Sequence, residues 1–461
     1  MPSPEGSSGH AMPGDATRLL IGPGHVHAAG RMLAGAGLLA CGDRIARIGS
    51  YDDVARVAGE RSERLDARGG LILPGFVNAH AHFYSALARG MTPPGEPAGD
   101  FAQILERLWW RVDRALDVED IRVSALLGLA ESARCGTTTV FDHHASPRAC
   151  AGSLDVVRSA VEEAGLRAVL CYEVSDRHGR ESAKEGIDEN VRFARELRRS
   201  PGPTVAACCG LHALFTIGEE TLTRAVVAAR AEELALHLHL AEDEIDVRRN
   251  LELHGVRPVA RLARAGGLTV DTLLAHAVHV NEEEIDRLAE SGAFVAHNPE
   301  SNMNNAVGAA PVARMLARGV RVGLGTDGVG ADMRASARAA FLLMRHAEGD
   351  PRAGWREVPR MLWQSNAALA SRTFGLPVGE LAVGAAADVA ILDYDPPTRL
   401  DAENLFAHLV FGFGARHVAS VVCAGRVIVR DRRVLTLDEA ALRARARERA
   451  AALWKRIAEQ A

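Results

Sequence analysis

Two histidines that are separated by one residue, His80 and His82, close an apolar stretch that begins at Leu71. Side chains two positions apart on a β-strand point to the same side, so both imidazoles can face one site. Imidazole nitrogens are preferred zinc ligands, and two of them on one face have the spacing of a metal site. The pair alone is a weak signal, because two histidines that only hydrogen-bond to protein neighbours have the same spacing.

Three more apolar stretches end in polar residues of the same chemical kind. His239 closes one of them, and Glu242 follows it by three residues, where a carboxylate can fold back over a site. His276 and His279 follow another, and their spacing lets only one of them reach that face. Asp327 lies in Gly325-Thr-Asp-Gly, where glycines permit close backbone approach. Taken singly, Glu242 is also consistent with a solvated loop acid, and the Asp327 segment with a surface turn.

The coincidence of these strand ends is more informative than any one of them. Three imidazoles and one carboxylate, from His80, His82, His239 and Asp327, suit Zn²⁺, and Fe²⁺ accepts the same ligands. We therefore predict one divalent metal ion per subunit, with Zn²⁺ as the first choice and Fe²⁺ as the alternative.

The elements that must bring these residues together alternate between apolar strands and amphipathic helices from residue 71 to residue 328. Continuously apolar strands are typical of a parallel sheet that is covered on both faces. Eight strands are expected: Leu71–His82, Thr137–His144, Arg167–Asp176, Val205–Ala213, Ala235–Glu242, Thr272–Val280, Ala293–Asn302 and Val320–Gly328. This count predicts an α/β fold, a (β/α)8 TIM barrel with its functional residues at the carboxyl ends of the strands. An open doubly wound sheet would need a glycine fingerprint after the first strand, and none follows it.

The pattern of apolar residues is different at both ends of the chain. Short apolar segments broken by glycine occur within 18–66 and again after residue 388, and they predict antiparallel strands. We expect residues 17–70 and 380–436 to form a small β-sandwich domain from both termini, flanking a metal-dependent hydrolase barrel at 71–379. Residues 1–16 are expected to be a disordered lead, and residues 437–461 a C-terminal helix.

Composition excludes several classes of function. The net charge is −5 and no basic stripe with interleaved aromatics occurs, so no nucleic-acid partner is expected. No run reaches the roughly 18 apolar residues of a membrane helix, so no membrane partner is expected. The seven cysteines form no CxxC pair, and the start of the chain lacks the pattern of a secretory signal. A cytoplasmic protein with reduced thiols is predicted.

The motifs together resemble the amidohydrolase superfamily, and within it the branch of triazine hydrolases, guanine deaminase and S-adenosylhomocysteine deaminase. The segments that carry the resemblance are Pro74-Gly-Phe-Val-Asn78 before His80-Ala-His82, His239-Leu-Ala-Glu242, His276-Ala-Val-His279, His297-Asn-Pro-Glu-Ser-Asn302 and Gly325-Thr-Asp327. Phe141-Asp-His-His-Ala-Ser-Pro147 and Cys171-Tyr-Glu-Val-Ser-Asp176 are most similar to SsnA-type aminohydrolases. The resemblance covers nearly the whole chain and is much less specific for substrate.

The resemblance implies catalytic roles. His80, His82, His239 and Asp327 match the metal ligands, and Asp327 would also accept the proton of the attacking water. Glu242 matches the proton shuttle of the deaminases, and His276 matches the residue that polarises the attacked group. Some relatives carry two metals bridged by a carboxylated lysine at the end of strand four. Because the only lysines, Lys184 and Lys455, lie elsewhere in the chain, that two-metal centre is excluded.

Substrate contacts are less strongly indicated. His212 matches a position that faces substrate in deaminase relatives, and His297, Ser301 and Asn302 are further candidates, each with structural hydrogen bonding as the alternative. Only one member of His143/His144, and one of Tyr172/Glu173, can face the barrel mouth. The loop 91–101 can act as a lid, whereas Trp109 and Trp110 are expected to pack on the barrel.

The sequence therefore predicts a hydrolytic deaminase, an aminohydrolase that acts on an amino-substituted heterocycle such as a purine or pyrimidine by attack of metal-bound hydroxide. Glu242 favours deamination, because a leaving amine needs a proton. Hydrolysis of another non-peptide C–N bond, in an amide or a triazine, is the enzymatic alternative. A barrel that serves only as a scaffold is the non-catalytic alternative, and it would not need an intact ligand set. The resemblance further implies a small-molecule heterocyclic substrate and a homo-oligomer, a dimer or a tetramer.

Overall fold

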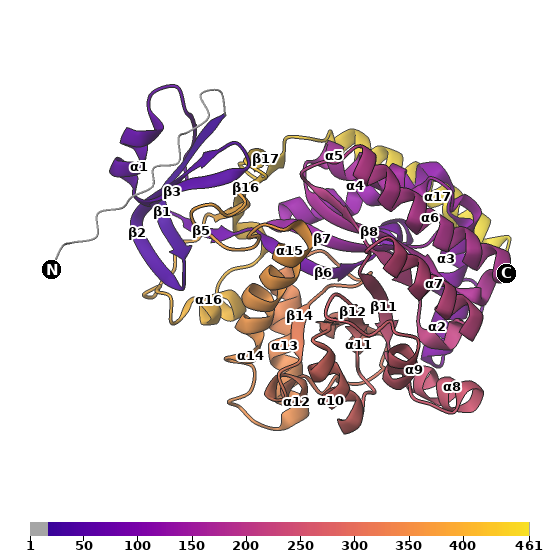
Figure 1. Ribbon diagram of the computed structural model, residues 1–461. Coiled ribbons are helices and arrows are strands. Elements are labelled where there is room, and N and C mark those ends of the chain that lie inside the picture. The colour runs from indigo at the N-terminus through magenta and orange to yellow at the C-terminus, as the bar shows by residue number, and fades with distance from the viewer. Residues whose placement is uncertain (1–16, 461) are drawn as a thin grey trace.

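The fold is centred on a parallel barrel (Figure 1), and the structure, a computed structural model, describes residues 17–460. The expected disordered lead, residues 1–16, lies outside the described residues. The barrel strands are β6 (Phe76–Ala81), β7 (Thr137–His144), β8 (Arg167–Val174), β10 (Cys209–Leu211), β11 (Leu236–Leu240), β12 (Leu273–His276), β13 (Phe294–His297) and β14 (Arg321–Leu324), with β9 (Val205–Ala207) paired to β8. A parallel bridge between Ala81 and Asp327 joins the first strand to the segment after the last. The predicted TIM barrel is confirmed.

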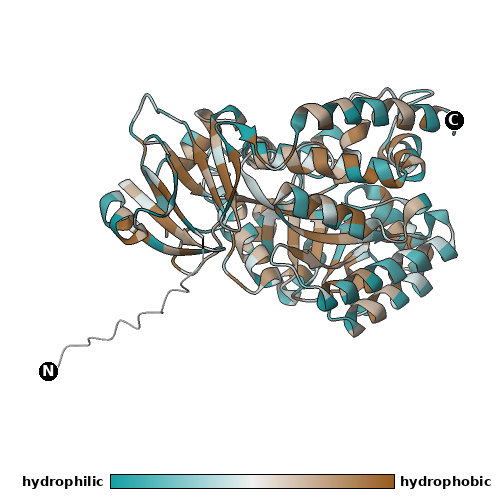
Figure 2. Cartoon of the chain, turned by 90° about the horizontal axis from the view of Figure 1, so that it is seen from above, coloured by the Kyte–Doolittle hydropathy of each residue, from teal (hydrophilic) through white to brown (hydrophobic). Residues whose placement is uncertain are grey.

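Every residue of β7, β8 and β11 is buried, as expected of parallel strands that are covered on both faces. Figure 2 shows the hydrophobic strands inside and hydrophilic outward faces on the surrounding helices. The helices that follow the barrel strands are α4 (Val118–Arg134), α5 (Ser153–Ala164), α6 (Arg180–Arg199), α7 (Glu219–Ala231), α8 (Glu244–His254), α9 (Pro258–Arg264), α10 (Glu282–Ser291), α11 (Pro299–Asn304), α12 (Val312–Ala317), α13 (Met333–Glu348), α14 (Glu357–Pro359) and α15 (Asn366–Phe374). Two short helices, α2 (Phe101–Ile104) and α3 (Trp110–Ala115), lie between β6 and α4. No helix in the described part of the chain combines the length and the apolar character that a membrane span requires.

The two ends of the chain meet in a second, mixed sheet. Its strands are β1 (Arg18–Ala28), β2 (Arg31–Cys41), β3 (Arg44–Ser50), β4 (Glu63–Leu65), β5 (Leu71–Pro74), β15 (Val389–Leu392), β16 (Val418–Cys423), β17 (Arg426–Arg430) and β18 (Arg433–Val434). Helix α1 (Tyr51–Ala58) packs on it, and α16 (Leu405–Phe411) lies between β15 and β16. The pairing of β15 with β5 joins the C-terminal strands to the N-terminal strands.

One predicted strand spans two sheets. Residues 71–82 read as a single barrel strand, but Leu71–Pro74 pair with β1 and β15 in the terminal sheet, and only Phe76–Ala81 enter the barrel. Gly75 lies at the change of sheet, where a Cβ would come within 2.4 Å of the Thr138 side chain. The apolar pattern runs through this point because both sheets bury the strand.

Two long-range contacts hold the outer elements on the barrel. A buried ion pair, Arg167 Nε to Asp388 Oδ2 at 3.2 Å, ties the start of β8 to the residue before β15. Helix α17 (Glu439–Ala458) lies along α4, as Figure 1 shows, and Trp454 Nε1 donates to the Leu87 carbonyl at 2.8 Å.

Candidate metal centre and active site

Four side chains converge at the carboxyl ends of the barrel strands. His80 lies on β6, His82 follows that strand, His239 lies on β11 and Asp327 follows β14. One donor atom from each lies within 4.8 Å of the others. Asp327 Oδ1 is 3.0 Å from His82 Nε2 and 3.5 Å from His80 Nε2, and His82 Nε2 is 3.2 Å from His239 Nε2. Such a set of converging nitrogens and an oxygen fits a divalent cation at its centre.

The protonation states of the cluster also fit a cation. Burial lowers the pKa of His80 to about 3, and burial holds the pKa of His239 well below its ordinary value, so both imidazoles are neutral and can act as ligands. Burial also lowers the pKa of His82, but the hydrogen bond and charge of Asp327 outweigh it and raise that pKa to about 9. His80 Nε2 is buried without a hydrogen-bond partner. The unpartnered His80 Nε2 is a position for a cation, and the proton that His82 carries beside Asp327 is one that a bound cation would displace.

Second-layer contacts orient the ligand imidazoles. His80 Nδ1 lies 2.8 Å from His237 Nε2, and His82 Nδ1 donates to the His143 carbonyl at 2.6 Å. On the other side of the His237 ring, His237 Nδ1 lies 3.8 Å from Cys171 Sγ. Because Nδ1 of His80 and Nδ1 of His82 each have a partner, the Nε2 atoms of these two candidate ligands are left free to face the cluster.

The backbone after β14 brings Asp327 to the cluster. Thr326 and Asp327 both donate their N–H groups to the His80 carbonyl, at 3.0 and 2.9 Å. Asp327 has φ of +55°, a conformation that is uncommon for a residue with a side chain. At Gly325, a Cβ would come within 2.3 Å of Asn298 Oδ1, so this close approach requires glycine. The turn at Gly325–Gly328 therefore places the Asp327 carboxylate at the cluster.

Glu242 and His276 lie beside the cluster and form a second group with Asp327. His276 Nε2 is 3.5 Å from Glu242 Oε2 and 3.7 Å from Asp327 Oδ2. On its other side, His276 Nδ1 is 2.8 Å from Asn302 Oδ1, and Asn305 Nδ2 donates to Glu242 Oε1 at 3.2 Å. Burial raises the pKa of Glu242 to about 7, so this carboxyl can both hold and release a proton near neutral pH.

The expected substrate contacts separate into two groups. His212 and Ser301 line the cleft next to the cluster, and Ser301 Oγ donates to Asp327 Oδ2 at 2.5 Å. Asn302 instead lies behind His276, and His297 is a buried residue of β13 outside the lining of the cleft. His279, the alternative to His276, bonds to the Val307 carbonyl at 2.8 Å.

A cleft lies over the cluster, with about 670 Å³ of space between its walls when the part open to solvent is included. Its aromatic lining comprises Tyr84, Phe101, Trp109, Trp110 and Phe215. Phe101 follows the loop that was expected to act as a lid, and Trp109 and Trp110, which were expected only to pack, contribute to the lining. An aromatic lining of this kind suits a flat heterocycle.

The structure separates the pairs that the sequence left open. Glu173 lies on the inward face of β8 and lines the cleft, whereas Tyr172 points to α6, where Gly186 leaves room for its ring. His143 points inward, with Nδ1 3.1 Å from Glu173 Oε2, and His144 Nε2 bonds to Ser146 Oγ at 2.9 Å.

Three residues of the site region carry no role in the sequence analysis: His237, Asp113 and Arg177. His237 has a visible signal, because it precedes His239 at the same spacing that flagged His80 and His82. Asp113 and Arg177 have none, because they come from a short helix and a loop that only the tertiary structure brings together.

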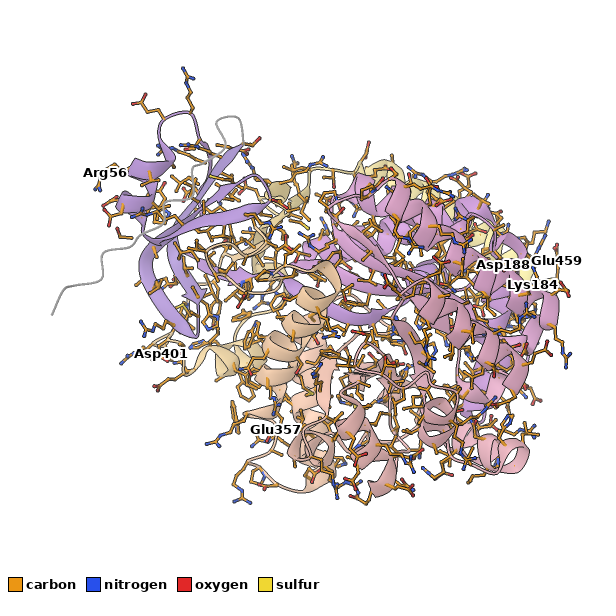
Figure 3. The ribbon with its side chains drawn as sticks, in the orientation of Figure 1. Arg56, Lys184, Asp188, Glu357, Asp401 and Glu459 are labelled. Carbon is orange, nitrogen blue, oxygen red and sulfur yellow. The ribbon has the colours of Figure 1, made fainter. Side chains whose placement is uncertain are left out.

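The two lysines lie outside this region. Lys184 pairs with Asp188 at 2.6 Å on the surface of α6, where Figure 3 labels both, and Lys455 is 4.0 Å from Glu459. A lysine-bridged two-metal centre is therefore incompatible with this chain.

Comparison with known proteins places this architecture among metal-dependent hydrolases. A model of the amidohydrolase family matches residues 71–428. A 5-methylthioadenosine/S-adenosylhomocysteine deaminase of Haloarcula marismortui is 37% identical over 416 residues, which cover 89% of this chain and 92% of that protein. A 5'-deoxyadenosine deaminase of Methanothermobacter thermautotrophicus is 34% identical, over 83% of this chain and 87% of its own. Among solved structures, an adenosine deaminase from Xanthomonas campestris with bound zinc superposes with a TM-score of 0.84 at 25% identity, over 97% of this chain and 100% of that chain.

Proposed function

We propose an adenine nucleoside as the substrate of this chain, which belongs to the amidohydrolase family and is a hydrolytic deaminase of amino-substituted heterocycles. The predicted family and enzyme class are confirmed by the family match and by the deaminase relatives. The relatives act, by their names, on 5'-modified adenosines, which makes the adenine 6-amino group the first candidate for attack.

The observation that carries the proposal is the placement of Glu242 and His276 against the metal ligands. We assign His80, His82, His239 and Asp327 to one divalent ion, Zn²⁺ in our proposal. Bound there, the ion would supply a water activated for attack at neutral pH.

Asp327 is proposed to receive the first proton. Its Oδ1 faces His80 and His82, while its Oδ2 accepts from Ser301 Oγ and lies 3.7 Å from His276 Nε2. Burial raises the pKa of Asp327, but the close approach of the His80 and His82 imidazoles outweighs it and holds that pKa well below its ordinary value. The carboxylate is therefore ionised and can accept a proton on its Oδ2 side.

Glu242 is proposed to move the proton to the substrate. Because its pKa is about 7, it can protonate the ring nitrogen next to the attacked carbon and then the leaving amine. Such a positioned acid contributes typically 10²–10⁴-fold to the rate. His276 donates through Nδ1 to Asn302 Oδ1, so its Nε2 side is held toward the reacting atoms and toward Glu242, 3.5 Å away. With a proton also on Nε2, the ring would stabilise the charge that develops on the attacked group.

Release of ammonia from a substrate panel tests the proposal. The zinc-loaded protein is incubated with adenosine, 5'-deoxyadenosine, 5'-methylthioadenosine, guanine, cytosine, an aminotriazine and a simple amide. We expect ammonia from one or more adenine nucleosides. Ammonia only from the triazine or the amide would move the assignment to another C–N bond, and ammonia from none would favour the scaffold alternative.

A matched variant separates the shuttle from the metal site. Glu242→Gln should retain its zinc, measured by elemental analysis, and lose activity by a factor of roughly 10²–10⁴. An unchanged rate in that variant would refute the shuttle role. Elemental analysis of the wild-type protein also decides between Zn²⁺ and Fe²⁺, and sedimentation velocity tests the predicted dimer or tetramer.

A further inference from the structure

A buried charge network forms one wall of the cleft. Arg177 donates through Nη1 to Glu173 Oε1 and through Nη2 to Asp113 Oδ2, both at 2.6 Å. The guanidinium also donates through Nε to His178 Nε2 at 3.2 Å, and it stacks over the Trp110 ring. All three charged side chains of the network are at most 6% exposed. Every nitrogen of the Arg177 guanidinium therefore has a hydrogen-bond partner inside the protein.

The network leaves one carboxylate oxygen without a partner. Asp113 Oδ2 is occupied by Arg177, but Asp113 Oδ1 is buried and accepts no hydrogen bond from any described residue. Asp113 is among the residues that line the cleft, and its side chain is 1% exposed. Burial raises the pKa of Asp113 to about 7 against the opposing charge of Arg177, so the ionised form is present from neutral pH upward. A buried carboxylate oxygen without a donor is costly, so this position favours a ligand that supplies one, and a cationic donor would also favour the ionised form.

His212 adds a second acceptor to the same wall. Thr216 Oγ1 donates its proton to the Ala213 carbonyl at 2.9 Å, so it must accept from His212 Nδ1 at 2.8 Å. With its proton on Nδ1, His212 presents an unprotonated Nε2, which lies 4.0 Å from Glu173 Oε1. Burial lowers the pKa of His212 to about 3, which is consistent with a neutral ring at neutral pH.

Outside the proposed metal site, the described lining of the cleft offers no lysine or arginine to balance its carboxylates. Four carboxylates line it, from Asp113, Glu173, Glu242 and Asp327, whereas none of its lining residues in the described chain is a lysine or an arginine. An anionic group placed on this wall would face carboxylates and acceptor nitrogen without a donor, an arrangement that disfavours binding.

We infer that the wall formed by Asp113, Glu173 and His212 is a subsite for the part of the substrate outside the reacting ring. This subsite binds a hydrogen-bond donor, an ammonium group above all, and rejects a carboxylate or phosphate. This inference rests on the proposed function for the identity of the ring. The orphan Asp113 Oδ1 and the acceptor nitrogen of His212 supply the attraction, and the absence of a lysine or arginine from the described lining supplies the selectivity.

Binding and turnover are measured with separate ligand sets. Binding uses hypoxanthines that carry a 2-aminoethyl, 2-hydroxyethyl or 2-carboxyethyl group on N9, because they have no amino group to lose from the ring. Calorimetry on the zinc-loaded protein at neutral pH gives their Kd values. We expect the aminoethyl compound to bind at least about tenfold tighter than the carboxyethyl compound, with the hydroxyethyl compound between them. Equal binding, tighter binding of the carboxylate, or no binding of any of the three would overturn the inference.

The adenine counterparts of the three ligands report turnover. The expected order in kcat/KM follows the order of binding. If binding follows the expected order but neither these adenine compounds nor the adenine nucleosides of the substrate panel release ammonia, the proposed function fails while the subsite stands.

Asp113→Asn tests the residue itself. The amide oxygen of the new side chain can still accept from Arg177, while its NH₂ group replaces the orphan acceptor with a donor. The preference for the ammonium tail should fall toward equality or reverse, whereas the control Asp53→Asn, on the exposed helix α1, should leave it unchanged. An Asp113→Asn protein that melts like the wild type and keeps the full preference would refute the role of Asp113. If this variant does not fold, the wild-type ligand series still decides the inference.

Discussion

Replacing His237 with leucine tests how much of the metal affinity comes from outside the ligand set. His237 Nε2 lies 2.8 Å from His80 Nδ1, and both rings are at most 1% exposed. A metal-bound His80 uses Nε2 as the ligand and must carry its proton on Nδ1. In the metal-free protein, the proton can move to Nε2 instead. In His237→Leu, the penalty for a buried Nδ1–H without an acceptor therefore falls mainly on the metal-bound state.

The magnitude follows from that argument. An unsatisfied buried donor costs about 1–3 kcal/mol. At about 1.4 kcal/mol for each factor of ten, zinc should bind roughly fivefold to hundredfold more weakly. Removal of an outer-shell partner of a metal ligand typically costs 10–100-fold, which agrees with this range.

Competition with a zinc-binding indicator at neutral pH measures the effect. His237→Gln is the matched rescue, because its amide oxygen can accept from His80 Nδ1, and it should recover part of the affinity. His254→Leu, on α8 away from the cluster, is the control. A folded His237→Leu protein with wild-type zinc affinity would show that the contact with His237 does not support the site.

Three other outcomes are expected. Asn302→Ala removes the hydrogen-bond partner of His276 Nδ1 and should lower kcat roughly tenfold, while zinc content and KM stay near the wild-type values. An unchanged kcat would contradict the positioning of His276 by Asn302. Arg167→Met leaves Asp388 buried without its partner, and urea denaturation should show a loss of about 3–5 kcal/mol; a loss below 1 kcal/mol would mean that water reaches the carboxylate. Burial raises the pKa of Asp246 to about 6, so the folded state holds this proton to higher pH than the unfolded state does. The contribution of protonated Asp246 to the free energy of unfolding is therefore full below about pH 4. It declines by ~3 kcal/mol as the pH rises through 6. The gap in unfolding free energy between wild type and Asp246→Asn should therefore narrow from acidic to neutral pH, and a gap that widens would reverse the sign of this assignment.

Periodicity and strand-end residues were enough to predict the barrel. Thr137–His144 is predicted and observed with the same bounds. The last barrel strand was predicted as Val320–Gly328 but ends at Leu324, since the chain turns there to place Asp327. The division of residues 71–82 between two sheets was not predictable, because burial on both sides of Gly75 gives the same apolar pattern.

The candidate metal ligands were predictable for a different reason. In a parallel barrel the carboxyl ends of all strands meet at one face, so strand position alone places His80, His239 and Asp327 together. The second layer lacks such a rule. Whether Tyr172 or Glu173 faces inward depends on the phase of β8 relative to its neighbours, and the contact between Arg177 and Asp113 depends on how a helix after a long loop lies against the barrel.

Glu173 links the two halves of the cleft. Its Oε1 accepts from Arg177 in the acidic wall, while its Oε2 lies 3.1 Å from His143 Nδ1 and 4.0 Å from the Nδ1 of the metal ligand His239. A divalent ion held by three neutral imidazoles and Asp327 retains one positive charge, and the ionised Glu173 carboxylate lies close enough to balance it. Arg177 donates to both Glu173 and Asp113. Glu173, which balances the charge of the metal, and Asp113, which selects the substrate tail, therefore belong to one network. A basic residue introduced to accept an anionic tail would compete for the carboxylate that the metal centre uses, so acceptance of anionic substrates is opposed by the metal site as well as by the wall.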